Sequence, residues 1–98
     1  MSVPVVFQRA ARTEFDSAAD WYEQHRSGLG IEFTVAVQGV LDRIATQPDF
    51  YPSVWKDVRE ALVRRFPYCI YYRNEPRQVL VLAVFHTARH PAIWRRRT

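Results

Sequence analysis

The chain has 98 residues, of which 48% are hydrophobic and 14% aromatic, a composition that fits one packed domain and excludes a disordered protein. No stretch approaches the roughly 20 apolar residues of a membrane span, and the N-terminal residues lack the apolar core of a signal peptide. The formal net charge is +4, so strong overall acidity is also excluded, and we expect a cytoplasmic protein without a membrane partner.

The first half of the chain predicts a strand followed by two helices. Residues 3–7 are a short apolar run typical of a strand. A helix then begins between residues 10 and 13, and its apolar residues recur with helical spacing: Phe15, Ala18, Ala19 and Tyr22. The acidic residues near them, Glu14, Asp16, Asp20 and Glu23, are expected on the outer side of this helix.

A glycine-containing turn separates the two helices. Gly28 and Gly30 interrupt the first pattern, and helical spacing resumes over residues 29–47 until Pro48 ends it. Because the connection is so short, the helices should form an antiparallel hairpin that covers a sheet. Gly39 costs about 1 kcal/mol relative to Ala within a helix, so we expect it to mark a close approach to another element.

The second half predicts three more strands. Residues 48–55 are expected to form a loop with aromatic anchors, and strands follow over residues 58–65, 68–73 and 79–85. The last of these, VLVLAVF, has no polar alternation, which predicts a strand buried on both faces inside the sheet. The order β-αα-βββ therefore predicts a single α+β domain over residues 1–98, with the N-terminal strand and the helical hairpin packed on a small, mainly antiparallel sheet.

Charge is divided unevenly between the two halves. Residues 1–50 carry four basic against seven acidic side chains, whereas residues 51–98 carry ten basic against three acidic ones. Nearly all the basic residues are arginines, whose planar fork suits phosphate or carboxylate groups. This asymmetry favours an acidic or polyanionic partner that faces the second half. The basic C-terminal tail is expected to become ordered only when such a partner is bound.

Two further residue types limit the chemistry. The single cysteine, Cys69, cannot form an internal disulfide, and its apolar neighbours predict a buried, unreactive thiol. The three histidines lack the spacing of a metal site and have no acidic cluster beside them, so we expect neither a metal nor another cofactor. Chemistry is expected instead after the central strand, where His86 and Arg89 follow and Pro91 stops the backbone from continuing in the sheet.

The sequence resembles a known toxin family. WYE in the first helix, RRFPYCIYY in the hairpin of strands and FHTARHPAIW at the end of the chain are similar to the RelE/ParE superfamily of type II toxin–antitoxin pairs, which includes plasmid stabilisation proteins. The resemblance implies a compact fold and neutralisation by a cognate antitoxin, in a dimer or a hetero-oligomer. RelE-like members cut messenger RNA on the ribosome, and ParE-like members inhibit DNA gyrase.

RNA cleavage is the activity that we expect first. His86 is the residue type that accepts and donates protons near neutral pH, and Arg89 beside it could hold a phosphate. Together with Arg65 and Tyr68 these residues form the expected catalytic set of a metal-independent endoribonuclease. The residues expected to bind nucleic acid or another target are Arg59, Arg64, Tyr72, Arg95 and Arg96.

Two alternatives remain open at this stage. A gyrase inhibitor needs no proton acceptor, and its basic contact surface would be the C-terminal sequence from Trp94 to Arg97 together with Arg89. The third hypothesis is an inactive domain that only binds its antitoxin, in which His86 and the strand arginines have structural roles.

Overall fold

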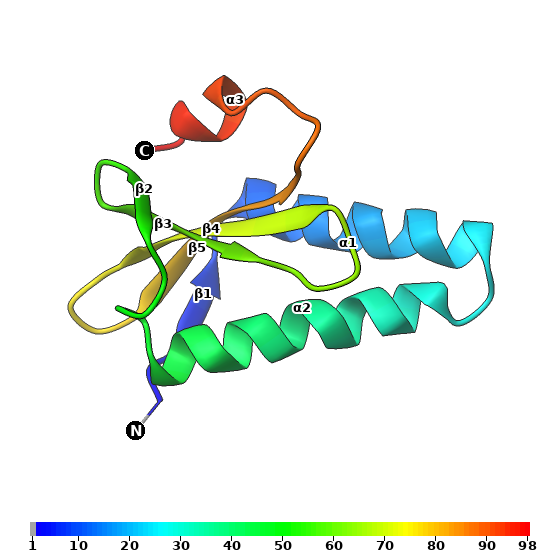
Figure 1. The fold of residues 1–98 in the computed structure, drawn as a ribbon, viewed down its shortest axis with the longest axis horizontal. Helices are drawn as coiled ribbons and strands as arrows, with labels where there is room; N and C mark the ends of the chain where they lie inside the picture. The colour runs from blue at the N-terminus through cyan, green and yellow to red at the C-terminus, as the bar shows by residue number, and fades with distance from the viewer. Residues whose placement is uncertain (1) are drawn as a thin grey trace.

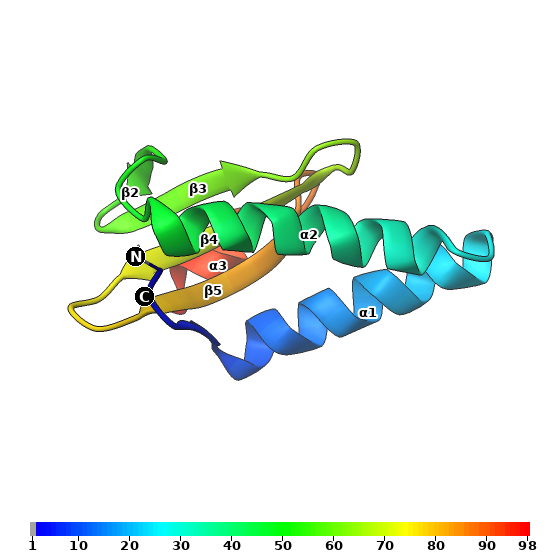
Figure 2. The same ribbon diagram turned by 90° about the horizontal axis from the view of Figure 1, so that it is seen from below.

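A computed structural model describes residues 2–98 and has the expected α+β fold (Figure 1). The elements in chain order are β1 (Val5–Phe7), α1 (Arg9–His25), α2 (Leu29–Thr46), β2 (Ser53–Trp55), β3 (Val58–Leu62), β4 (Tyr68–Asn74), β5 (Val79–His86) and α3 (Ala92–Arg95). The helical hairpin covers one face of the sheet, and the short α3 lies on the other face (Figures 1 and 2). No helix in residues 2–98 is long and apolar enough to cross a membrane.

The sheet has five strands in the order β1-β5-β4-β3-β2. Only β1 pairs in parallel, with β5, and the remaining pairs are antiparallel. The interior position predicted for β5 is therefore confirmed, and its residues from Val81 to Phe85 are all buried. This explains why its sequence lacks polar alternation, since both of its faces are covered.

A large apolar cluster fills the space between the helices and the sheet. Phe15 and Phe33 of the hairpin pack together with Phe66, Ile70 and Tyr72 of the sheet side. At the turn between the helices, Glu23 accepts hydrogen bonds from the backbone N–H groups of Gly28 and Gly30, which caps the start of α2. The hairpin is thus held at both its apolar stripe and its turn.

The glycines of α2 play different roles from those expected. At Gly30 an added Cβ atom would lie only 2.7 Å from the Ala19 carbonyl oxygen, so this residue allows the helices to approach closely. At Gly39 nothing lies within 4 Å of such an atom, so the predicted close approach at Gly39 is wrong. The reason is its position on a side of α2 that faces open space.

A smaller cluster lies on the opposite face of the sheet, beneath α3. Trp94 is 2% exposed and stacks on Tyr71 with 4.1 Å between the ring centroids. Cys69 belongs to this cluster, and burial raises the pKa of its thiol to about 11. The expectation of a buried thiol is confirmed, whereas Trp94 lies in the core and not on the basic surface where we expected it.

Two boundaries and the C-terminal residues differ from the sequence prediction. The expected loop over residues 48–55 ends in a short strand, β2, which pairs with β3 through an irregular register. The strand expected over residues 58–65 ends at Leu62, and Arg65 then adopts a positive φ of 71° in the turn. The C-terminal residues include the short helix α3, which the sequence did not predict; Trp94 is buried there, and Arg97 binds Glu14.

Candidate functional site

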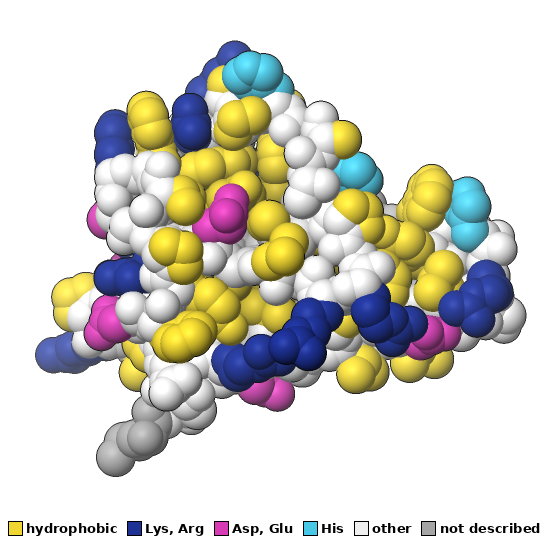
Figure 3. Space-filling model, viewed as in Figure 1, with side chains coloured by type: hydrophobic (Ala, Val, Ile, Leu, Met, Phe, Trp, Pro, Cys, Tyr) yellow, Lys and Arg dark blue, Asp and Glu magenta, His cyan; other side chains and the backbone are white. Residues whose placement is uncertain are grey.

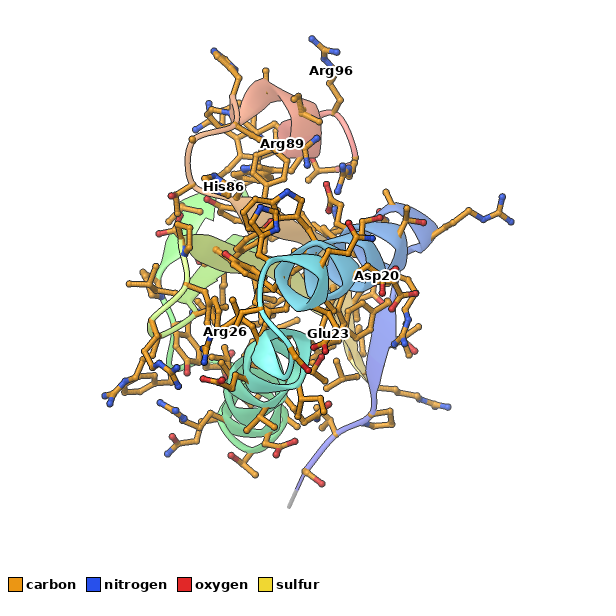
Figure 4. All side chains as sticks on the ribbon, turned by 90° about the vertical axis from the view of Figure 1, so that its right-hand side faces the viewer. Asp20, Glu23, Arg26, His86, Arg89 and Arg96 are labelled. Atoms are coloured by element: carbon orange, nitrogen blue, oxygen red, sulfur yellow. The ribbon has the colours of Figure 1, made fainter. Side chains whose placement is uncertain are left out.

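A cleft of about 570 Å³ lies between α1, the end of β5 and the turn that follows β3. It is lined by Thr13, Glu14, Ser17, Ala18, Trp21, Tyr22, Pro67, Tyr68, Val84, His86 and Arg89. Figure 3 shows a notch bordered by yellow side chains over α1, and Figure 4 shows His86 and Arg89 on one side of that helix. The cleft is thus an aromatic groove with cationic groups at one end.

Trp21 forms one wall of the cleft. Its ring stacks on His25 with 3.7 Å between centroids and meets Tyr22 edge-on at 5.1 Å. The His25 Nδ1–H donates to the Trp21 carbonyl oxygen, which fixes the imidazole beneath the indole. Although 54% of Trp21 remains exposed, these contacts hold it in place, as expected of a residue that contacts a partner.

Glu14 organises the cationic end of the cleft. Its carboxylate accepts hydrogen bonds from Arg89 at 2.7 Å, from Arg97 at 2.9 Å and from the Val84 backbone N–H at 3.2 Å. Arg97 also donates to the Leu82 carbonyl oxygen, and the side chain of Glu14 is 13% exposed. Two guanidinium groups share one carboxylate, so this end keeps a net positive charge while Arg89 is held in an ion pair.

His86 lies in the cleft at the end of β5. Its Nδ1 accepts a hydrogen bond of 3.0 Å from the Ala88 backbone N–H, so the proton of the neutral ring is on Nε2. The ring also meets Tyr68 edge-on at 5.2 Å, and burial raises the pKa of the Tyr68 phenol. In this state the neutral imidazole presents a donor, and not a proton acceptor, at Nε2.

Comparison with known proteins identifies the family. A family model of the ParE toxin of the type II toxin–antitoxin system parDE matches residues 5–91. The chain belongs to this family. A solved structure of the chromosomal ParDE system from P. aeruginosa has the same fold, with a TM-score of 0.62, 18% identity, and coverage of 87% of this chain and 96% of that chain. None of the curated proteins compared matches the chain.

The ParE fold brings together only part of the catalytic set expected from the sequence. His86, Arg89 and Tyr68 line the cleft, whereas Arg65 does not. Arg65 donates instead to Glu32 at 2.7 Å, which links the turn after β3 to α2. This hydrogen bond is the main cause of the lowered pKa of the Glu32 carboxyl group.

Two residues expected to bind a target have structural positions in this ParE chain. Tyr72 is fully buried, its hydroxyl donates to the Pro48 carbonyl oxygen at 2.6 Å, and burial raises its pKa to about 12. It therefore cannot stack on a base, because it faces the core. Arg59 donates to the carbonyl oxygens of Asp49 and Tyr51, and so ties β3 to the loop after α2.

The remaining expected binding residues lie at the surface. Arg64 and Arg96 are exposed, and the Arg95 guanidinium stacks over the Trp55 ring at 4.5 Å. Figure 3 shows dark blue side chains around α3, and Arg96 points away from the body in Figure 4. Arg95, half-buried at the end of α3, and the exposed Arg96 that follows it thus form a basic surface outside the cleft.

Sequence reasoning placed Glu14 on the outer side of α1, but the structure places it at the cleft. No sequence pattern signals this role, because its partners Arg89 and Arg97 are far away in the chain. Residues 2–98 contain no group of three or more His, Cys, Asp or Glu side chains that could hold a metal ion.

Proposed function

We propose that this ParE-family toxin stops growth by binding DNA gyrase in the cytoplasm, and not by cutting RNA. The observation that carries the proposal is the state of the expected catalytic groups. Arg89 and Arg65 are held by Glu14 and Glu32, and the Nδ1 atom of His86 already accepts a backbone hydrogen bond. The ParE family match supports the same activity.

RNA cleavage through the 2′-hydroxyl makes demands that these groups meet poorly. It requires a proton acceptor, a cation on the phosphate and a donor for the leaving oxygen. A neutral His86 with its proton on Nε2 can donate but not accept there, and the ion pair with Glu14 holds the Arg89 guanidinium in place. Binding to gyrase demands only a shaped surface, and Arg95 at the end of α3 and Arg96 after it supply one that is basic.

A supercoiling assay tests the proposal. The purified chain is added to DNA gyrase, relaxed plasmid and ATP, and we expect loss of the supercoiled product that is reversed by the cognate antitoxin. Replacing Arg95 and Arg96 by Ala together should raise the inhibitory concentration by about 10-fold, the effect expected if at least one of them is a main contact residue. Arg77→Ala, at an exposed position after β4, is the matched control. Unimpaired supercoiling at a large excess of the parent toxin would reject gyrase as the target.

Ribosome-linked RNA cleavage is the second candidate, because Tyr68, His86 and Arg89 do share one aromatic cleft. Bases of single-stranded RNA stack on such side chains. The test is a cell-free translation reaction in which messenger RNA ends are mapped by primer extension, with a His86→Ala, Arg89→Ala double variant alongside. New ends that require both residues would replace the gyrase proposal. If neither assay responds, the inactive antitoxin-binding domain is the remaining hypothesis.

A further inference from the structure

Three cations without an internal partner gather where β2 meets the C-terminal residues. We call Lys56, Arg95 and Arg96, together with Trp55, the basic platform. None of the three cations forms an ion pair within residues 2–98, and the Nε–H of Arg95 has no hydrogen-bond acceptor there. Figure 3 shows dark blue side chains around α3 at this side of the molecule. The platform is thus a positive surface that the fold leaves uncompensated.

Trp55 holds two of these cations at one ring. The Arg95 guanidinium lies over the indole at 4.5 Å from the ring centroid, and the Lys56 ammonium group lies at 5.5 Å from it. Trp55 itself packs against the apolar cluster beneath α3, so the ring is a fixed support. Two like charges held at one ring repel each other, and a bound anion would relieve that repulsion.

Lys56 occupies a backbone position that suits other residue types better. It begins the two-residue connection between β2 and β3, and its φ is 53°. Hairpin turns with a positive φ favour Gly, Asn or Asp, because the Cβ atom of most other residues is strained there. Strained positions of this kind cluster at functional sites. The lysine in this turn therefore points to a role for its charge.

The acidic side chains of β3 and the turn before it have other partners. Asp57 forms an ion pair with Arg73 at 3.0 Å. Glu60 accepts a hydrogen bond of 2.7 Å from the Tyr71 hydroxyl. The charge of the platform therefore stays available to a polyanionic partner, the kind of partner that the many arginines in the second half of the chain favour.

We propose that the basic platform binds the phosphate backbone of duplex DNA, so that the toxin contacts the DNA held by gyrase as well as the enzyme. The planar fork of arginine matches phosphate oxygens, and lysine binds phosphate as a point charge. Contacts of this kind position a protein on DNA without reading its sequence. The contact with gyrase-held DNA rests on the proposed function, whereas binding to free DNA is measured without the enzyme.

The first test is fluorescence anisotropy of a short labelled DNA duplex over a range of salt concentrations. Three phosphate contacts predict that log Kd rises with the logarithm of the salt concentration with a slope of about 2.7. Lys56→Asn and Arg96→Ala should each lower this slope by about 1 and weaken binding equally for every duplex sequence. Lys56→Arg keeps the charge and should bind like the parent. The control is Arg43→Ala, at an exposed arginine of α2 on the opposite face of the sheet.

Lys56→Asn also separates binding from folding. Because Asn tolerates a positive φ, this variant should melt at the same temperature as the parent or higher while it binds DNA more weakly. If the parent does not bind the duplex, or if Arg43→Ala lowers the slope as much as Lys56→Asn does, the platform is not a DNA site.

Binding to gyrase then distinguishes DNA from an acidic protein surface. Calorimetric titration of the toxin into gyrase should give a higher affinity when the enzyme holds a DNA duplex, and Lys56→Asn should remove that gain. If Lys56→Asn weakens binding equally without DNA, the platform contacts acidic residues of gyrase and the DNA proposal is wrong. If the toxin binds free duplex with the expected slope but does not bind gyrase, the gyrase proposal fails while the DNA site stands.

Discussion

Replacing Glu14 by Ala should destabilise the fold by about 2–4 kcal/mol. The change leaves Arg89, Arg97 and the Val84 N–H without their shared acceptor. Removing one partner of a fully buried ion pair costs about 3–5 kcal/mol. The expected loss is smaller here, because Arg89 is 41% exposed and water can replace its partner, whereas Arg97 is 17% exposed and stays poorly hydrated. Glu14→Gln keeps one acceptor oxygen and should cost about half as much.

Urea unfolding with linear extrapolation measures these changes. The double variant Glu14→Ala, Arg97→Ala closes a mutant cycle, and the coupling free energy should be about 1–3 kcal/mol if the two side chains act as a pair. Asp16→Ala is the control, because its ion pair with Arg12 is exposed and should contribute no more than about 0.5 kcal/mol. A loss below about 0.5 kcal/mol for Glu14→Ala, or simple additivity in the cycle, would refute the argument that Glu14 anchors the C-terminal residues.

Three smaller predictions follow from other positions. Gly39→Ala should raise the melting temperature, since it gains about 0.5–1 kcal/mol in open space, whereas Gly30→Ala should lower it by forcing the helices apart. The Cys69 thiol should react with a disulfide reagent at pH 8 only as fast as the protein unfolds, because burial raises its pKa to about 11 and keeps it protonated and covered. Its contribution to stability is complete below pH 9 and is lost as pH rises through the raised pKa. The hydrogen bond from Arg65 lowers the pKa of Glu32, so the contribution of Glu32 to stability is present above pH 4.5 and is lost as pH falls through the lowered pKa. Glu32→Gln should therefore flatten the acid side of a plot of unfolding free energy against pH.

The sequence predicted those elements that carry a strong periodic or continuous apolar pattern. The buried run of β5 could only lie inside a sheet, and the helical spacing around Phe15 and Phe33 identified both helices of the hairpin. The glycine turn at Gly28 then required the two helices to be antiparallel, and Gly28 does adopt a φ of 88°. These patterns are local consequences of burial, and therefore a single sequence displays them.

The elements that the sequence missed depend on contacts made across the fold. The four residues of α3 are too few to form a stable helix alone, and the stacking of Trp94 on Tyr71 holds them in place. The three residues of β2 likewise exist because β3 lies beside them. Glu14 was predicted to be exposed because helical spacing places it beside the apolar stripe, and only the arginines that follow β5 draw it into the cleft.

The error at Tyr72 has a different physical cause. Strand alternation would place one of two adjacent tyrosines on a wet face, but both faces of β4 are covered, by the hairpin on one side and by α3 on the other. A register irregularity between Tyr71 and Tyr72 accompanies their burial on these two faces. An aromatic pair in a central strand is therefore a weak signal for a base-stacking surface unless the cover of each face is known.

Much of the uneven charge of the sequence is neutralised by ion pairs within the fold. Acidic side chains from the first half of the chain pair with Arg59, Arg65, Arg89 and Arg97 from the second half. The pairing cancels much of the asymmetry that suggested a polyanionic partner, and it leaves a smaller basic surface around Arg95 and Arg96 at the end of α3. Asp20, on the far side of the hairpin, stays unpaired within residues 2–98. A partner that covered both surfaces would need acidic residues near the end of α3 and basic residues beside Asp20 on α1, so a single partner segment of uniform charge could not complement the whole molecule.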